Sequence, residues 1–349
     1  MNRFEYTRPA TLAEAVAAGA VPGASYLAAG TNLMDLLKGG VMWPAHLVDI
    51  SRLPGLDRIE RLSDGGVRIG ALVRNADLAH DTDFARRFPA VAEALLSGAS
   101  AQLRNAATAG GNLLQRTRCA YFYDTASACN KREPGAGCDA VGGENRLHAI
   151  LGWSEHCIAT HPSDFCVPLV ALDAVVEVAG PAGRRDIPLE DLHLLPGSTP
   201  EHETVLEPGE LITAVRLPAE SAGFAGHARY LKIRERTSYA FAVVSAAAAL
   251  RLDGGVVTAV RLALGGVALK PWRARAAEAA LTGATPNAAA FRLAAEAALA
   301  DARPSGDNAF KIELARRIVV RALTLAAAGT PDRMPALPAS PFSGAMTHV

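Results

Sequence analysis

Five cysteines are the residues whose type and spacing most clearly indicate chemistry in this chain of 349 residues. They all lie between positions 119 and 166, and the rest of the sequence contains none. Thiols that serve only as small core residues would be scattered, so this crowding indicates that one site uses several of them. An odd number argues against a closed set of disulfides, and a chain of this length does not need them. Metal ligation is therefore favoured over redox-active thiols.

The spacing of these cysteines does not by itself identify a metal. It reads C-x9-C-x8-C-x18-C-x8-C, without the C-x-x-C pairs of zinc ribbons and common ferredoxins. Four thiolates satisfy either a [4Fe–4S] cluster or a tetrahedral zinc ion. Three nearby histidines are further candidate zinc ligands, namely His148, His156 and His161.

Two similar segments contain the other candidate binding residues, Ala29-Gly30-Thr31-Asn32-Leu33 and Ala109-Gly110-Gly111-Asn112-Leu113. We expect each to place glycine where a strand gives way to a turn, because a residue without a Cβ lets backbone N–H groups approach an anion. Two such loops facing one another would suit a pyrophosphate that joins two nucleotide halves. The alternative is two ordinary tight turns, since neither segment matches G-x-G-x-x-G or the phosphate loop ending in Gly-Lys-Ser/Thr.

The elements that must position these residues begin with a mixed α/β segment. A helix is expected over 11–20, where Thr11 and Glu14 can form a capping box. Apolar runs and turn residues predict further helices over 33–38 and 90–96. Short strands are predicted over 25–29, 46–50, 66–69, 167–172 and 175–178. Between them, residues 114–160 are rich in glycine, cysteine and charge without periodicity, so we expect a long irregular insertion, and such loops are usually functional.

From Tyr230 onward the pattern changes to that of an α+β unit. Strands are predicted over 240–251 and 256–264, and alanine-rich helices over about 272–282, 288–301 and 309–328. The tail from Pro331 is expected to be extended and poorly ordered.

Composition excludes several classes of function. Lys plus Arg and Asp plus Glu both number 35, so no net field favours nucleic acid or an anionic membrane. No apolar run reaches the roughly 18–20 residues that span a bilayer. No Gly-x-Ser-x-Gly elbow frames a hydrolytic nucleophile, and the N-terminus lacks the features of a secretion signal.

Four motifs in their order resemble the FAD-binding subunits of the xanthine dehydrogenase family. They are the two glycine segments, His161-Pro162-Ser163-Asp164 and Lys232-Ile233-Arg234-Glu235-Arg236. The resemblance runs from about Phe4 to residue 328. The cysteine-bearing insertion looks like that of the bacterial periplasmic aldehyde oxidoreductases, in which this segment holds a [4Fe–4S] cluster. That match covers residues 112–119 and Cys129-Asn130-Lys131-Arg132.

The resemblance implies an α+β protein with two domains. Residues 1–222 would form a two-subdomain FAD-binding fold of the vanillyl-alcohol-oxidase/PCMH type, with subdomains at about 1–55 and 56–222 and the insertion at about 114–160. Residues 223–330 would form an α+β C-terminal domain with an antiparallel sheet and a three-helix bundle, followed by an extended tail over 331–349.

The same resemblance implies how FAD is bound. The first loop would wrap the pyrophosphate and the second segment would approach it from the other side. Asp164 would hydrogen-bond the ribityl or ribose region, Lys232 would lie near the flavin ring, and Tyr239 or Phe241 would cover one face of it. The implied cofactor-binding residues are Leu27, Ala28, Ala29, Gly30, Thr31, Asn32, Leu33, Thr108, Gly110, Gly111, Asn112, Asp164 and Lys232. Relatives commonly have glycine where this chain has Ala29, which must then keep an ordinary negative φ.

The implied [4Fe–4S] cluster needs four thiolates, so five cysteines leave one spare. Cys166 begins an apolar run over 166–170 and is interpreted as a small buried residue. The implied ligands are Cys119, Cys129, Cys138 and Cys157. Five basic residues suit the negative charge of such a cluster, although each also fits a solvated loop: Arg116, Arg118, Lys131, Arg132 and Arg146. Zinc remains the alternative metal.

The implied function is that of a FAD and [4Fe–4S] electron-transfer subunit in a heterotrimer, with no side chain needed as a general acid or base. A large molybdenum cofactor subunit would oxidise an aldehyde to a carboxylic acid, and a small subunit with two [2Fe–2S] clusters would pass electrons to this FAD. The alternatives are the flavin subunit of a 4-hydroxybenzoyl-CoA reductase-like enzyme and, from another class, a zinc-stapled interaction module. Location in the periplasm by way of a partner's twin-arginine signal is expected, with the cytoplasm as the alternative.

Overall fold

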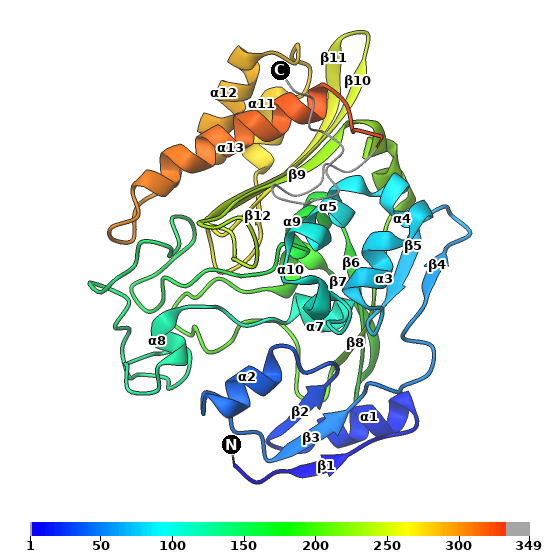
Figure 1. Cartoon of the computed structure of the whole chain (residues 1–349), viewed down its shortest axis with the longest axis vertical. Coiled ribbons are helices and arrows are strands. Elements are labelled where there is room, and N and C mark those ends of the chain that lie inside the picture. Colours follow the sequence, from blue (N-terminus) through cyan, green and yellow to red (C-terminus); the bar gives the residue numbers. More distant parts are fainter. Residues whose placement is uncertain (1, 333–349) are drawn as a thin grey trace.

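The computed structural model describes residues 2–332 and arranges them around three β-sheets (Figure 1). The N-terminal and C-terminal sheets lie towards opposite ends of the molecule, with a five-stranded sheet between them (Figure 1). Helices pack against the central and C-terminal sheets. The mixed α+β class that the sequence predicts is confirmed.

The N-terminal sheet consists of three parallel strands in the order β1-β3-β2. They are β1 (Glu5–Thr7), β2 (Ala24–Leu27) and β3 (His46–Asp49). Helix α1 (Leu12–Gly19) begins at the predicted capping box, in which Glu14 N donates to Thr11 Oγ1 at 3.2 Å and the Glu14 carboxylate accepts from Thr11 N. This pairing satisfies two donors that the helix cannot satisfy itself. Helix α2 (Leu33–Lys38) occupies its predicted range directly after the first glycine loop.

The central sheet is antiparallel, with the strand order β4-β5-β8-β6-β7. Its strands are β4 (Ile59–Arg61), β5 (Val67–Gly70), β6 (Val175–Gly180), β7 (Gly183–Pro188) and β8 (Leu211–Leu217). The helices of this region are α3 (Asn75–His80), α4 (Thr82–Arg87), α5 (Pro89–Ser97), α6 (Ala101–Arg104), α7 (Ala109–Leu113), α9 (Cys166–Ala171) and α10 (Leu189–Leu192). Phe84, Phe88 and Phe165 are almost inaccessible in their shared core, and each such burial stabilises the fold by about 1.5–3 kcal/mol.

The range 167–172 was predicted to be a strand and is helical instead. Helix α9 begins at Cys166, and Pro168 lies in its first turn, where an N–H group would have no partner within the helix. All six side chains of α9 are buried. A segment with no polar face gives no periodicity, so the sequence cannot separate a buried helix from a buried strand. The strand predicted at 175–178 is present as part of β6.

The C-terminal sheet is an antiparallel sheet in the order β12-β11-β10-β9, reached through the 3₁₀ helix η1 (Ala219–His227). Its strands are β9 (Ala228–Ile233), β10 (Val244–Asp253), β11 (Val256–Gly265) and β12 (Trp272–Arg273). The three predicted helices are present as α11 (Arg275–Leu281), α12 (Ala288–Ala298) and α13 (Phe310–Ala327). Alanines on β10 and α13, among them Ala246, Ala248 and Ala315, let the helix pack closely on the sheet.

The insertion, residues 114–160, is irregular as predicted. It contains one four-residue helix, α8 (Ala120–Tyr123), and two isolated β-bridges that pair Cys129 with Cys138 and Ser154 with Cys157. None of the helices between residues 2 and 332 combines the length and apolar character that a membrane crossing requires. Most of the tail predicted from residue 331 lies outside the described residues.

Candidate cofactor and metal sites

The first glycine loop leaves β2 and enters α2. Gly30 has a φ of +73°, and a Cβ at this position would lie 2.8 Å from Met34 Cγ, so the loop requires glycine here. Ala29 is not among the residues with positive φ, as expected. Asn32 faces the insertion, because its Oδ1 accepts a hydrogen bond from Arg116 N at 2.8 Å. The loop is therefore tied to the start of the insertion.

The second glycine segment is not a strand-to-turn loop, contrary to the prediction. Ala109–Leu113 form the short helix α7, and its N-cap Thr108 accepts a hydrogen bond from Gly111 N at 3.3 Å. A hydroxyl at this position favours a helix start over an extended turn, which explains the difference. Gly110 packs against Ala71, the residue that follows β5, where a Cβ on Gly110 would lie 2.9 Å from that of Ala71.

Asp164 and Lys232, predicted as two parts of one site, form a buried ion pair. Lys232 Nζ lies 2.7 Å from Asp164 Oδ2, and the two side chains are 4% and 8% exposed. Tyr230 OH donates to Asp164 Oδ1 at 2.5 Å. Tyr230 and Lys232 are two residues apart on β9 and share a face of the strand. Ser163, the residue before Asp164, donates from Oγ to Asn112 Oδ1 at 2.8 Å. This bond links the second glycine segment to the buried ion pair.

Tyr239 and Phe241, the candidates for covering the flavin, lie in the segment between β9 and β10, and both side chains are exposed. Tyr239 has a φ of +49°, which is uncommon for a residue with a side chain. The Phe241 ring lies under the guanidinium of Arg118, at 4.9 Å from the ring centre. Phe241 is thereby held against the insertion.

A cavity of about 290 Å³ opens at the end of α7, and its lining includes Leu114, His161 and His193. His161 Nε2 and His193 Nδ1 are buried without a hydrogen-bond partner among residues 2–332. Burial lowers the pKa of His193 to about 4 and that of His161 well below its ordinary value, so both rings are neutral. Because buried polar atoms without partners are rare, this cavity fits a polar ligand.

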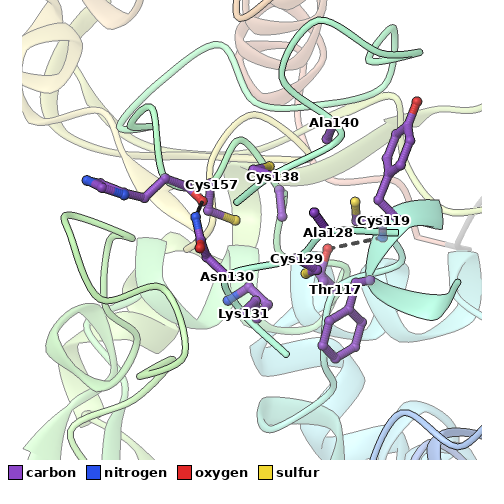
Figure 2. Close-up of a pocket in the computed structure, with 13 residues that line it drawn as sticks. Thr117, Cys119, Ala128, Cys129, Asn130, Lys131, Cys138, Ala140 and Cys157 are labelled. Atoms are coloured by element: carbon purple, nitrogen blue, oxygen red, sulfur yellow. Dashed lines mark hydrogen bonds between the residues drawn. The ribbon is translucent and has the colours of Figure 1, made fainter. Parts of the chain in front are cut away.

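The four predicted ligand cysteines line one cavity within the insertion. Figure 2 shows the sulfur atoms of Cys119, Cys129, Cys138 and Cys157 around a common space. Among the described residues, His161, Cys166 and His193 also place three potential metal-ligand atoms within 4.8 Å of one another. Cys166 is inaccessible within the core of the central region and takes no part in the cysteine cavity.

Burial raises the pKa of two of the cavity thiols, those of Cys119 and Cys157, and so favours their protonated form. It raises the pKa of Cys119 to about 12, against the opposing effect of hydrogen bonds from Phe122 and Tyr121. It raises the pKa of Cys157 to about 11, against the opposing charge of Lys131. Metal ligands must be thiolates, so ligation here would release protons.

Several basic residues of the insertion are paired with protein groups. Lys131 lines the cysteine cavity with a 1% exposed side chain, and it pairs with Glu203 at 2.8 Å. Arg116 pairs with the same carboxylate at 2.9 Å. Arg132 donates to backbone carbonyls, and Arg146 forms an exposed ion pair with Glu235. The positive charge next to the cavity is therefore partly offset by Glu203.

Two family models together match most of the chain. The FAD binding domain in molybdopterin dehydrogenase matches residues 2–220, and the CO dehydrogenase flavoprotein C-terminal domain matches residues 229–326. The chain is an FAD-binding medium subunit of the molybdenum hydroxylase family.

Individual relatives agree with this assignment. The medium subunit is 51% identical to the aldehyde oxidoreductase FAD-binding subunit PaoB of Escherichia coli K12 over 330 residues, which cover 94% of this chain and 99% of the relative. Its fold is similar to that in a carbon monoxide dehydrogenase from Hydrogenophaga pseudoflava, with a TM-score of 0.73, 31% identity and coverage of 94% and 98%. Quinoline 2-oxidoreductase from Pseudomonas putida gives a TM-score of 0.72 at 25% identity, with coverage of 94% and 98%.

Sequence reasoning missed two residues that shape the sites of this medium subunit, and it connected a third only with zinc. Glu203 follows the insertion by many residues yet neutralises Lys131, and no local pattern signals that contact. His193 faces His161 with ring centres 4.4 Å apart. The third is His148, a candidate zinc ligand by sequence, whose Nε2 lies 3.2 Å from Cys119 Sγ.

Proposed function

We propose that the chain is the FAD and [4Fe–4S] electron-transfer subunit of a molybdenum-dependent aldehyde oxidoreductase. The observation that carries the proposal is the convergence of four cysteines on one cavity, in an insertion between two FAD-binding motifs. The 51% identity to an aldehyde oxidoreductase subunit supports the substrate class.

The donor set of the cavity is all thiolate, which both a [4Fe–4S] cluster and a zinc ion accept. The resemblance of the insertion to that of the aldehyde oxidoreductases favours the cluster. We therefore propose Cys119, Cys129, Cys138 and Cys157 as its ligands, with Cys166 excluded.

The residues proposed to hold FAD lie on four segments, namely the first glycine loop, α7 with its cap, the residue Asp164 before α9, and β9. The loop over 27–33 and Thr108 with Gly110 to Asn112 would bind the pyrophosphate, and the positive φ of Gly30 supports a close backbone approach there. Asp164 and Lys232 would orient the ribityl side and the ring, and their mutual ion pair fixes both side chains. Bound FAD supplies one- and two-electron redox chemistry, while the protein supplies binding and orientation.

We propose that a large molybdenum cofactor subunit and a small subunit with two [2Fe–2S] clusters complete the complex. Electrons from the aldehyde would reach this chain through the small subunit and leave to an external acceptor. Whether the [4Fe–4S] site lies on that route or only braces the insertion is tested with Cys129→Ser. A slower electron transfer with FAD retained supports a route through the site, and unchanged turnover in a folded, cluster-free variant leaves a structural role.

One experiment tests the cofactor content directly. The purified chain is expected to be yellow-brown, with flavin absorption, a broad iron–sulfur shoulder and stoichiometric iron and acid-labile sulfide. A colourless protein that contains zinc would instead support the interaction module. Oxidation of aldehydes by the whole complex, against reduction of an aromatic acyl-CoA, separates the proposed enzyme from the 4-hydroxybenzoyl-CoA reductase-like alternative.

We also propose that the assembled complex works in the periplasm and is exported on a partner subunit's twin-arginine signal, with the cytoplasm as the alternative. A complex whose cofactors are inserted before export needs a route for folded proteins. Cell fractionation with and without the twin-arginine translocase would test this, and a chain found in the cytoplasm of both strains would contradict it.

A further inference from the structure

His148 lies buried beside the cysteine cavity, with its Nε2 at 3.2 Å from Cys119 Sγ. A thiolate carries no hydrogen and only accepts, so this contact has one possible direction once Cys119 is a metal ligand: Nε2–H donates to Sγ. The other ring nitrogen, Nδ1, is buried without a partner among residues 2–332. A proton on Nδ1 would therefore be unsatisfied, which favours the tautomer that donates to Cys119.

The backbone on both sides of this histidine is held by the start of α13. Lys311, which is inaccessible to solvent, donates Nζ to the carbonyls of Leu147 at 2.9 Å and His148 at 2.8 Å. Asn308, equally inaccessible, donates to the carbonyls of His148 and Ala149, each at 3.1 Å. In Figure 1 the start of α13 lies next to the insertion, well away from α2. Two buried side chains of the C-terminal domain thus fix the backbone from Leu147 to Ala149, which carries the His148 ring.

We propose that His148 is a positioning residue for the iron–sulfur site, whose Nε2–H bond to the Cys119 thiolate stabilises the reduced, more negative state of the cluster. This inference rests on the proposed [4Fe–4S] function. Hydrogen bonds to the sulfurs are one of the determinants of cluster potential, and groups beyond the ligands orient and tune them. Through Asn308 and Lys311, the C-terminal domain sets that hydrogen bond.

The test compares two side chains of similar length in the purified complex. His148→Gln places an amide donor near the position of Nε2, whereas His148→Met fills similar space without a donor. His156→Met is the control, because His156 is exposed and also lines the cysteine cavity. Redox titration followed by low-temperature EPR measures the ratio of reduced to oxidised cluster, and iron and sulfide analysis measures its content.

We expect His148→Met to shift that ratio about tenfold towards the oxidised form, which is about 59 mV for a one-electron couple. His148→Gln should keep the ratio of reduced to oxidised cluster close to the wild-type value, and His156→Met should match the wild type. A cluster retained in the Gln variant and lost in the Met variant also supports the donor role. Wild-type potentials in both variants, or loss of the cluster in both, would overturn it. If the wild type contains no iron or sulfide, the proposed cluster itself fails.

Discussion

The C-terminal domain and the insertion meet at the start of α13, but different interactions stabilise them. In the domain, the ten-residue strands β10 and β11 pair along their length and bury a continuous apolar core. In the insertion, many of the buried side chains are polar, such as Asn130, Lys131, Asn145 and His148. Its backbone is fixed by side-chain hydrogen bonds and surrounds a cavity of thiols. The domain can therefore fold largely on an apolar core, to which Ile150 and Leu151 at the end of the insertion also belong, while the cavity part of the insertion depends on what its cysteines bind.

The largest expected effect is the loss of a ligand. Cys129→Ser should remove the cluster and speed hydrogen exchange in residues 114–160 by roughly 100-fold, because metal binding and local folding are coupled. Amides of β10 and β11 should exchange as in the wild type. Exchange followed by mass spectrometry measures both regions. The matched control is Cys166→Ala, which should keep its iron; equal loss of iron in both variants would contradict the ligand assignment.

The converse change weakens the domain and spares the insertion. Leu262 on β11 is inaccessible, so Leu262→Ala should lower the free energy of unfolding by about 3 kcal/mol through the cavity it leaves. Cluster content per folded molecule should not change. Calorimetry and iron analysis check the two statements, and a Leu262→Ala variant without iron would show that the two regions are not independent.

A smaller effect is expected at the buried charges that join the insertion to residue 203. Burial alone would raise the pKa of Glu203, but Lys131 and Arg116 hold it below the ordinary 4.5. Since the folded-state pKa is lowered, the stabilisation is fully present above pH 4.5 and is lost as the pH falls through the folded-state pKa.

Glu203→Gln leaves Lys131 without its partner and should destabilise the insertion by about 2 kcal/mol, less than for a fully buried pair because Glu203 is 23% exposed. Limited proteolysis between pH 7 and pH 3 measures opening of the insertion. The wild type should become more sensitive below pH 4.5, whereas the Gln variant should be sensitive throughout. An acid response that is the same in both proteins would rule out this pair as its cause.

The smallest effect is expected at the surface. Arg146 and Glu235 join the insertion to the segment after β9, but their side chains are 57% and 49% exposed. Solvent screens such pairs, so Arg146→Ala should change the free energy of unfolding by less than about 1 kcal/mol. Chemical denaturation would measure it, and a larger loss would mean that surface charge, and not the cavity, holds the insertion.

The same contrast explains what could be predicted from the sequence. The capping box at Thr11 and the three C-terminal helices follow local rules, and the structure contains them. Helix α9 was missed because its side chains are all apolar and buried, so no periodicity exists to read. Thr108, the cap of α7, is a usable sequence signal for the start of that helix, although the glycines after it favour a loop.

At the candidate site, residue types indicated the cysteine set, but their neighbours came from distant parts of the chain. Glu203, Asn308 and Lys311 contact the insertion through long-range contacts that no spacing encodes. Residue types alone could therefore indicate the ligands. The groups that orient those ligands and offset the charges near them are identified only from the structure.

Crystallography of the purified complex with anomalous data at the iron edge tests the central claim most directly. The account predicts a cluster-sized iron peak bonded by the sulfurs of Cys119, Cys129, Cys138 and Cys157, with Cys166 unliganded. A single metal ion without iron signal between those sulfurs, or four sulfurs without any metal in a complex that retains its flavin, would contradict it.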